Sequence, residues 1–309
     1  MTFPGRFGDS LIADELDKLS VSFLVDGLDV RRGGTAANIS FGLGKLGLHP
    51  VLVGAVGQDF DADYRPWLEA AGVDTSGVVV SSTQHTARFV CTTDSTQAQI
   101  ASFYPGAMGE AGDIDVLSLG AFDLVLISPD DPAAMVRHTQ ACRDAGVPFA
   151  ADPSQQLTFA DSDMIRSVVD GATYLFSNDY ESALIEQKTG WSGDEVNSRV
   201  GTRITTHGKD GVTVYPAEGE PVNVKAIPGV NAVDPTGVGD SFRAGFLAGI
   251  AADLDFERSA QIGCTIASLV VETTGTQEYE IDRESFLARL GDAYGDAAAS
   301  DVDSALSLS

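Results

Sequence analysis

The chain has 309 residues, of which 43% are hydrophobic and 21% are charged, so it is long enough for one large α/β domain or two smaller ones. It holds 45 acidic residues against 19 basic ones, a formal net charge of −26. A surface of this charge repels nucleic acid and anionic membranes. The sequence shows no apolar run of transmembrane length and no secretory signal pattern. We therefore expect no nucleic-acid partner and no membrane partner.

The acidic residues are spread between apolar segments, which indicates a folded acidic surface rather than a disordered tail. Such an excess favours a cytoplasm rich in salt, where screening weakens the repulsion; an acidic protein from an ordinary cytoplasm is the alternative. The cysteines Cys91, Cys142 and Cys264 are far apart and lack metal-ligand spacing. This use of cysteine is typical of a reduced, cytoplasmic protein.

The first part of the chain predicts extended segments followed by a helix. Residues 20–30 alternate partly between polar and apolar side chains, which predicts one or two strands with a turn at Asp26-Gly27. The pair Gly33-Gly34 ends this segment, and small residues then open a helix. Asn38 falls in the first turn of that helix, where its amide can bind a polar group. Satisfaction of local backbone groups is the alternative for Asn38.

Residues 78–104 contain three short β-like runs. Together with the extended segment near residue 23, they predict a small sheet separate from the main body. Within this sheet Phe89 and Phe103 face each other or a ligand, with core packing as the commoner alternative. Before it, the sequence predicts a buried strand at 51–56 and a helix at 64–71.

From residue 122 onward, strand-like and helix-like runs alternate. The expected strands are 123–128, 147–151, 174–177, 202–206 and 211–215, and the expected helices are 132–145, 164–169 and 180–188. This order predicts a mostly parallel sheet between two layers of helices. Further helices are expected at 242–252, 256–271 and 283–294, followed by a frayed tail at 297–309.

Polar residues follow several of the predicted strands. They are Gln155 and Gln156 after one strand, Asn178 and Glu181 after the next, Gly208 after another, and then the stretch from Asp234 to Asp240. In such sheets ligands bind beyond the carboxyl ends of the strands. The coincidence of these positions predicts a single binding site at that edge.

The stretch from Asp234 to Asp240 reads D-P-T-G-V-G-D and leads into the apolar helix. A helix N-terminus offers unpaired N–H groups and a partial positive charge, so it binds anions. A carboxylate at the same point is explained if the anion is a phosphoryl group in transfer and Asp240 takes the proton of the attacking hydroxyl. An ordinary N-cap aspartate is the alternative.

Three motifs together resemble those of one enzyme family. Gly33-Gly34-x-x-x-Asn38, the D-x-x-G-x-G-D stretch ending at Asp240, and Asn178-x-x-Glu181 resemble the signatures of the ribokinase-like (PfkB) carbohydrate and nucleoside kinases. Within that family the likeness is greatest to bacterial-type adenosine kinases, over residues 22–26, 86–89, 101–108, 151–156 and 273–277. The resemblance covers most of the chain. It implies a single ribokinase-like domain over residues 1–309, with lid strands near 20–34 and 78–104.

The resemblance also implies a role for each matching residue. Asp240 would be the catalytic base. The anion hole would consist of the backbone N–H groups of Gly237, Val238 and Gly239. Substrate would be bound by Gly34 and Asn38 at the ribose hydroxyls, by Phe89 and Phe103 in the lid, and by Gln155 and Gln156 near the base.

On the cofactor side, the resemblance implies ATP as co-substrate together with Mg²⁺, and a monovalent cation such as K⁺, for which many relatives have a site. The ATP-binding residues would be Asn178, Thr206, Gly208 and Gly211. Glu181 would serve Mg²⁺, and Asp234 with Thr236 and the loop around Thr274 would form a monovalent-cation site. Lid strands pair subunits in many members of the family, so a homodimer is expected.

One expected element is missing. The family normally opens with a β-strand carrying G-x-x-x-x-D, whose carboxylate binds the sugar hydroxyls. Here the segment from Phe3 to Phe7 resembles the residues just after that strand, and Asp9 is not its equivalent. We expect the true start to lie upstream of Met1; otherwise a substrate ligand and a central strand are absent.

The resemblance implies transfer of the ATP γ-phosphoryl group to the 5′-hydroxyl of adenosine, a purine-salvage reaction that gives AMP and ADP. A sugar kinase of the same family acting on ribose or a ketohexose is one alternative. A non-catalytic nucleoside-binding protein is the other, and the intact stretch around Asp240 argues against it.

Overall fold

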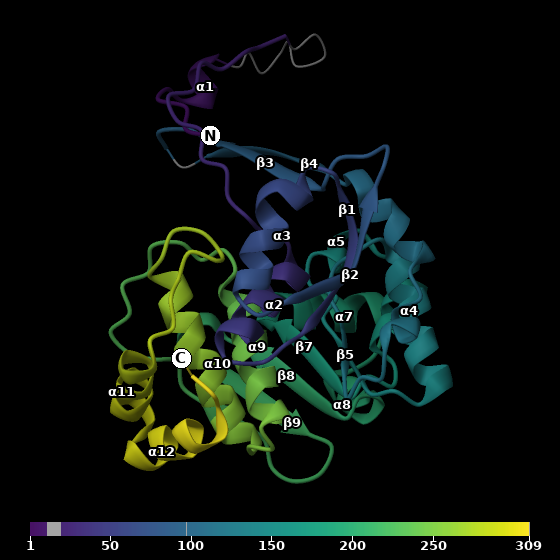
Figure 1. The fold of residues 1–309 in the computed structure, drawn as a ribbon, viewed down its shortest axis with the longest axis vertical. Helices are drawn as coiled ribbons and strands as arrows, with labels where there is room; N and C mark the ends of the chain where they lie inside the picture. Colours follow the sequence, from purple (N-terminus) through teal and green to yellow (C-terminus); the bar gives the residue numbers. More distant parts are fainter. Residues whose placement is uncertain (11–19, 97, 309) are drawn as a thin grey trace.

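The computed structural model describes residues 1–10, 20–96 and 98–308. Its central feature is a six-stranded sheet of order β10-β9-β8-β7-β6-β5 (Figure 1). Its strands are β5 (Val125–Ile127), β6 (Phe149–Ala151), β7 (Tyr174–Asn178), β8 (Thr202–Thr206), β9 (Val212–Pro216) and β10 (Val222–Val224). The strands from β5 to β8 are parallel, whereas β9 and β10 are antiparallel at one edge. The predicted mostly parallel sheet is confirmed.

Helices cover both faces of this sheet, so its inner strands are apolar on both sides. On one face lie α4 (Pro132–Ala145), α6 (Ser162–Val169), α7 (Asp179–Thr189) and α8 (Gly193–Arg199). On the other lie α9 (Val238–Ala251) and α10 (Phe256–Val271). Successive residues of one strand enter different clusters, as Leu175 and Phe176 show, because strand side chains alternate between faces.

Helices α9 and α10 pack closely side by side. A Cβ atom on Gly245 would lie 2.7 Å from the Cα atom of Gly263, so the contact requires glycine on α9. This close approach fixes the position of α9 relative to α10. None of the described helices is both long and apolar enough to span a membrane.

A second, smaller sheet pairs β1 (Val51–Gly57) with β2 (Asp74–Ser81) in parallel, with α3 (Phe60–Ala70) between them. We expected residues 78–80 to belong to the lid, and this was wrong: Val78 pairs with Gly54 of β1. A buried neighbouring strand edge is a stronger partner for this apolar run than an exposed hairpin. In the described residues, β1 and β5 share no strand pairing.

The lid is the antiparallel pair β3 (Arg88–Thr93) and β4 (Gln99–Tyr104), which stands apart from the body near the N-terminus (Figure 1). The prediction of lid strands within residues 20–34 was wrong, since within the described residues that segment makes only one bridge, from Gly27 to Thr2. The edge of β3 is instead occupied by the first residues of the chain: the N–H of Phe3 donates to Thr93 O at 2.9 Å. Residue 97, between β3 and β4, lies outside the described residues.

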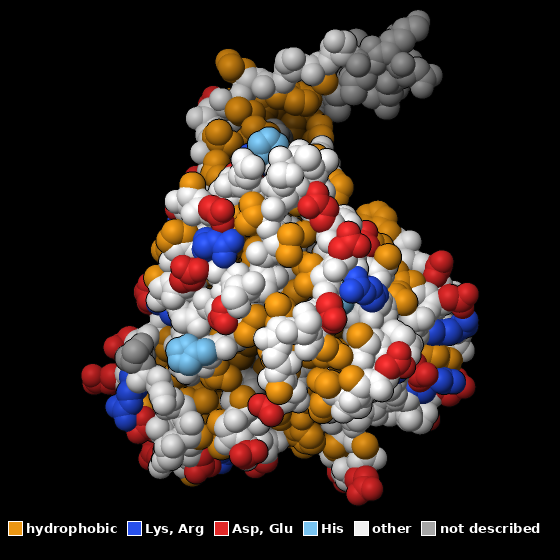
Figure 2. All heavy atoms as spheres, turned by 45° about the vertical axis from the view of Figure 1, so that its right-hand side comes forward, with side chains coloured by type: hydrophobic (Ala, Val, Ile, Leu, Met, Phe, Trp, Pro, Cys, Tyr) orange, Lys and Arg blue, Asp and Glu red, His pale blue; other side chains and the backbone are white. Residues whose placement is uncertain are grey.

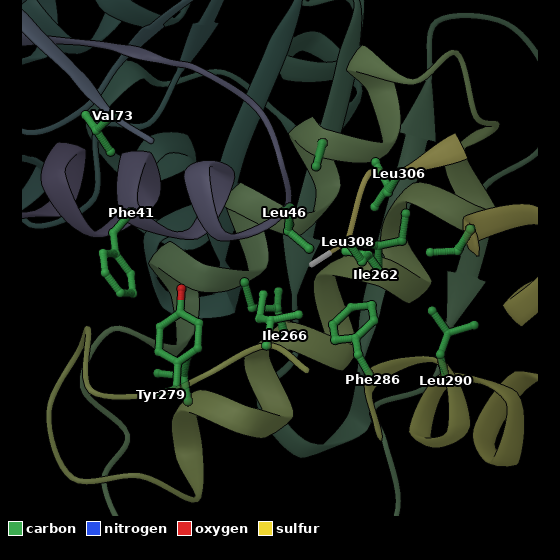
Figure 3. Packing of buried hydrophobic residues seen from close by; sticks show 14 of the residues in the cluster. Phe41, Leu46, Val73, Ile262, Ile266, Tyr279, Phe286, Leu290, Leu306 and Leu308 are labelled. Carbon is green, nitrogen blue, oxygen red and sulfur yellow. The ribbon is translucent and has the colours of Figure 1, made fainter. Parts of the chain in front are cut away.

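The chain ends are ordered by packing. The frayed tail predicted at 297–309 was wrong for the described part, which forms α12 (Asp296–Ala305). Val302 is completely buried, and Leu306 and Leu308 join the cluster around Ile262 (Figure 3). In the part of the chain that the structure describes, the remaining elements are α1 (Phe7–Ser10), α2 (Thr35–Lys45), α5 (Gln156–Phe159), α11 (Arg283–Tyr294) and the 3₁₀ helices η2 (Gly106–Asp113), η3 (Val116–Leu119) and η4 (Gly208–Asp210).

Candidate active site

The loop before α9 places Asp240 in the first turn of that helix. Gly237 caps the helix with φ 77°, and a Cβ atom there would lie 2.9 Å from Thr276 Cβ, so glycine is required on both counts. The N–H of Val238 makes only a long contact, 3.4 Å, with Pro235 O. The first helical bond runs from the N–H of Ser241 to Gly237 O. The preceding N–H groups, including that of Gly239, therefore present the unpaired donors of a helix start.

The carboxylate of Asp240 is held by Asn38 from α2. Asn38 Nδ2 donates to Asp240 Oδ2 at 2.7 Å. Burial raises the pKa of Asp240 to about 6; Arg243 and the Asn38 hydrogen bond lower it, while the Asp152 and Glu181 carboxylates add to the rise. A carboxyl with this pKa changes its charge near neutral pH, as a proton acceptor for a hydroxyl must.

Asn38 is in turn fixed by residues beyond α10. Its Oδ1 accepts hydrogen bonds from Thr276 Oγ1 at 2.9 Å and from Gln277 Nε2 at 2.8 Å. Gln277 is completely buried and also donates to Tyr64 Oη. The sequence predicted Asn38 as a ribose ligand; the structure adds that it orients Asp240. Thr276 and Gln277 were not predicted as site residues, although they lie in the 273–277 stretch that resembles the kinase family.

A buried arginine lies beside this network. Arg243, also on α9, is 5% exposed, and its Nη2 donates to Asp152 Oδ1 at 2.7 Å. Its Nη2 is 3.8 Å from Glu181 Oε2. The nearby carboxylates keep the pKa of Arg243 above its usual range in spite of burial. Arg243 and Asp152 were not predicted as site residues; the signal was a guanidinium in a helix whose other residues after Ser241 are apolar.

Asn178 and Glu181 form a capping box at the start of α7. Asn178 Oδ1 accepts from the N–H of Glu181 at 2.9 Å, and Glu181 Oε2 accepts from the N–H of Asn178 at 2.8 Å. Burial raises the pKa of Glu181, while Arg243 and the hydrogen bond from Asn178 lower it. Both contacts of the Glu181 carboxylate within the described residues are made by Oε2, so Oε1 can bind another ligand. Mg²⁺ is commonly bound by one or two carboxylates plus substrate phosphates, so Glu181 fits such an ion.

The expected monovalent-cation loop is closed by protein donors. Asp234 Oδ1 accepts from the N–H of Thr236 at 2.9 Å, and Oδ2 from the N–H of Gly275 at 3.0 Å. Thr274 O accepts from Arg31 Nη1 at 3.3 Å. Each of these oxygens accepts one protein hydrogen bond, which leaves a lone pair on each, and the role of this loop as a cation site stays a prediction. Within the described residues there is also no cluster of three acidic, histidine or cysteine side chains arranged around a metal.

The predicted residues near the substrate side lie at the opening of α2 and after β6. Gly34 caps α2 with φ 103°, a conformation that favours glycine. Gln155 Nε2 is 3.5 Å from Thr35 Oγ1, and Gln156 Nε2 donates to Asp130 O at 2.7 Å. Gln155 therefore borders the start of α2, whereas the Gln156 amide is committed to the backbone after β5.

On the predicted nucleotide side, Thr206 ends β8 and pairs with Val212 of β9. Gly208 and Gly211 both have positive φ, 56° and 105°. A Cβ atom on Gly211 would clash with Val224 O, whereas one on Gly208 would meet nothing within 4 Å. Gly211 is thus required by the turn, and Gly208 leaves open space beside the carboxyl end of β8.

The two lid phenylalanines lie directly opposite each other, since Phe89 pairs with Phe103 in the register of β3 and β4. They are 69% and 57% exposed, so the core-packing alternative is wrong for both. Figure 2 shows hydrophobic side chains gathered at the lid end of the molecule, in contrast to the acidic side chains spread over the body. These rings offer apolar area to a ligand or a partner.

The parallel sheet, the glycine loop at a helix N-terminus and the oriented carboxylate define a small-molecule phosphotransferase of ribokinase-like fold. The model of the pfkB family of carbohydrate kinases matches residues 9–283, and the chain belongs to this family. Its members are ATP-dependent kinases of sugars and nucleosides.

Solved structures and curated proteins agree with this assignment. The chain is similar to Burkholderia thailandensis nucleoside kinase in complex with inosine, with 34% identity, a TM-score of 0.85, and 96% of this chain and 95% of that chain covered. It is 32% identical to a nucleoside kinase of Methanothermobacter thermautotrophicus, over 85% of this chain and 86% of the relative. It is also 31% identical to an ATP-dependent ribose-1-phosphate kinase of Halopiger xanaduensis, over 79% and 82%.

Proposed function

We propose that this protein is an adenosine kinase, which transfers the γ-phosphoryl group of ATP to the 5′-hydroxyl of adenosine and produces AMP and ADP. The observation that carries the proposal is the placement of Asp240: a carboxyl with a pKa of about 6, oriented by Asn38, directly beside the free amides of a helix start. The likeness to nucleoside kinases supports a nucleoside as acceptor.

In the proposed reaction Asp240 accepts the proton of the 5′-hydroxyl as the O5′–P bond forms. The N–H groups of Gly237, Val238 and Gly239, with the dipole of α9, stabilise the charge on the phosphoryl oxygens. Asn38 keeps the carboxylate of Asp240 aimed at the hydroxyl. Glu181, together with the phosphates, would hold Mg²⁺, which would neutralise part of the charge of ATP.

The remaining predicted residues have proposed places around this centre. Gly34 and Asn38 face the ribose, while Phe89 and Phe103 cover the adenine when the lid closes, with Gln155 and Gln156 on the opposite side. ATP lies along Asn178, Thr206, Gly208 and Gly211, at the carboxyl ends of β7 and β8. Stacking on an aromatic ring is worth about 1–3 kcal/mol for a base, which favours a purine over a free sugar.

The test is ADP production by the purified chain with Mg·ATP in high salt, comparing adenosine, inosine, ribose, fructose and ribose 1-phosphate. Each reaction is run in NaCl and in KCl. We expect turnover with adenosine to exceed that with every sugar. Turnover with ribose or ribose 1-phosphate alone would contradict the proposal, and binding of adenosine without ATP consumption would favour the non-catalytic alternative.

A sugar kinase is the second candidate, and the ribose-1-phosphate kinase relative is the observation that favours it. Such an enzyme needs a cationic group for the substrate phosphate. Arg88, at the start of β3, is 60% exposed in its side chain but is paired with Asp59 Oδ2 at 2.9 Å. The Arg88→Gln variant distinguishes the candidates. If the protein is a ribose-1-phosphate kinase, the variant should bind ribose 1-phosphate more weakly than the parent. If it is an adenosine kinase, the variant should bind adenosine nearly as well as the parent.

We also propose that two copies of the chain associate through the lid. Every residue of β4 is exposed, including Ile100 and Tyr104, and an exposed apolar two-stranded sheet is only marginally stable alone. Light scattering across a concentration series measures the oligomeric state. A monomer at all concentrations would contradict this proposal without touching the kinase assignment.

A further inference from the structure

Arg243 lies within the apolar helix α9, one turn beyond Asp240. Its side chain is 6% exposed, and Asp152, the carboxylate that anchors it, is completely buried. Taking two charges out of water costs several kcal/mol for each ion, and their attraction often only balances that cost. A buried pair of this kind is weak evidence for a purely stabilising role, so its position calls for another explanation.

The guanidinium lies directly beneath the glycine loop. Long side chains on a helix lean toward its N-terminus, and a Cβ atom on Gly239 would lie 2.9 Å from Arg243 Nη1. Gly239 is one of the residues whose N–H groups are proposed to form the anion hole. Glycine at this position therefore lets the guanidinium approach the loop from below.

Some N–H donors of Arg243 make no hydrogen bond within the described residues. In this part of the chain its hydrogen bonds all come from Nη2, to Asp152 Oδ1 at 2.7 Å and to Ser154 Oγ at 3.3 Å. The buried Nε has no partner. Asp152 and Ser154 thus hold one end of the guanidinium, and Nη1 stays available beside the loop.

Negative charge surrounds this point. Asp152, Glu181 and Asp240 all act on Arg243, so an anion entering the loop would meet three carboxylates. Fixed positive charge beneath the loop offsets their repulsion. Lysine does not replace it well, because arginine presents several donors in a fixed planar fork.

We propose that Arg243 is a catalytic residue of the phosphoryl transfer, whose Nη1 donates to an oxygen of the transferred group from beneath the anion hole. The inference rests on the proposed kinase function. In the step, the O5′–P bond forms and the bond from the γ-phosphorus to the bridging oxygen breaks. The electron pair of that bond leaves with ADP, the hydroxyl proton goes to Asp240, and Arg243 stabilises the charge without exchanging a proton.

The test uses variants that keep the core neutral. Arg243→Gln alone leaves Asp152 buried and uncompensated, so the informative variant is the double one, Asp152→Asn with Arg243→Gln, alongside Arg243→Lys. The matched control is Arg203→Gln, which removes an arginine that is 8% exposed and bonded to Ser182 and Glu186 on α7. Removing one donor to the transition state typically costs about 100–1,000-fold in kcat.

We expect that loss of kcat in the double variant, a smaller loss in Arg243→Lys, and an adenosine KM within about threefold of the parent in both. Binding of ADP with aluminium fluoride and adenosine, which imitates the transition state, should weaken by a similar factor. Arg203→Gln should leave both unchanged. A folded double variant with the parental kcat and parental binding of the fluoride complex would overturn the inference.

Binding of inorganic phosphate, measured by calorimetry in KCl, separates the two proposals. If the parent turned over no acceptor but bound phosphate, and the double variant bound it at least tenfold more weakly, the kinase proposal would fall and the anion contact of Arg243 would stand. If the parent and the double variant bound phosphate equally and had equal kcat, Arg243 would have no role in the site.

Discussion

The site around Asp240 and the lid differ in how their side chains are held. Asn38 and Gln277 are buried, and each makes at least two side-chain hydrogen bonds within the network. Phe89 and Phe103, by contrast, are more than half exposed. The first region is fixed before any ligand arrives, and the second is free to adapt.

This difference separates chemistry from selectivity. A preorganised carboxylate and amide loop need no rearrangement at the moment of reaction, which is where electrostatic catalysis gains most. An exposed hairpin gains its contacts only on closing over a ligand. We therefore expect changes near Asp240 to act on kcat, and changes in the lid to act on KM and on the choice of acceptor.

The largest effect is expected from Asp240→Asn. The amide still accepts the hydrogen bond from Asn38 but takes no proton, so kcat should fall at least about 100–10,000-fold. The folded pKa of Asp240 is raised above its unfolded value, so its charge costs stability as pH rises from about 4 through about 6. The variant should therefore unfold at pH 7 no more easily than the parent, as a denaturant titration would show. Parental turnover would show that Asp240 is not the base.

A smaller effect is expected from Asn38→Ala, which releases the carboxylate of Asp240 and removes one of the hydrogen-bond partners of Gln277. Loss of one charge-assisted hydrogen bond is worth about 1.5–3 kcal/mol, so kcat/KM should fall about tenfold to a hundredfold. Gln277→Ala tests the same network less directly, because Asn38 then keeps its hydrogen bond to Asp240. The loss of kcat/KM should therefore be smaller than in Asn38→Ala. An equal loss of kcat/KM in both variants would mean that Gln277 matters as much as the direct contact.

The pH profile of kcat/KM should show the titration of Asp240. The base is active when deprotonated, so activity should fall about tenfold per pH unit below about pH 6 and level off above it. Asn38→Ala removes a hydrogen bond that lowers this pKa, so the limb should move to higher pH. A profile that stays flat from pH 5 to pH 7 would contradict the assignment.

The smallest effect is expected in the lid. Phe89→Ala and Phe103→Ala should raise the adenosine KM about fivefold to tenfold, because each exposed ring offers a stacking surface worth about 1 kcal/mol, the low end of the range for a base on an aromatic ring, while kcat stays close to that of the parent. Unfolding free energies should hardly change, since both rings are exposed. Phe159→Ala, at a ring that is 84% exposed on α5, is the control. A fall in kcat without a rise in KM would mean that the lid contributes to chemistry after all.

The sequence predicted the fold well where local patterns and packing agree. The bounds of α4, α10 and α11 coincide with the expected helices at 132–145, 256–271 and 283–294. In these helices the apolar periodicity and the residues at the helix ends indicate the same bounds. Three predictions failed, at residues 20–34, 78–80 and 297–309. In each case the local pattern was compatible with several partners, and the available strand edge or buried surface decided between them.

The sequence by itself determined the family motifs, the parallel sheet and the start of a helix at the D-P-T-G-V-G-D stretch. These depend on glycine conformations, apolar runs and short-range spacing, all of which are local. Only the tertiary structure decided that Asn38 orients Asp240, that Gln277 fixes Asn38, and that Arg243 lies beneath Gly239. Except for Arg243 and Gly239, these contacts join residues far apart in the chain, and the role of Arg243 depends on distant Asp152 as well. Such contacts form only when burial forces polar groups to find partners across different elements.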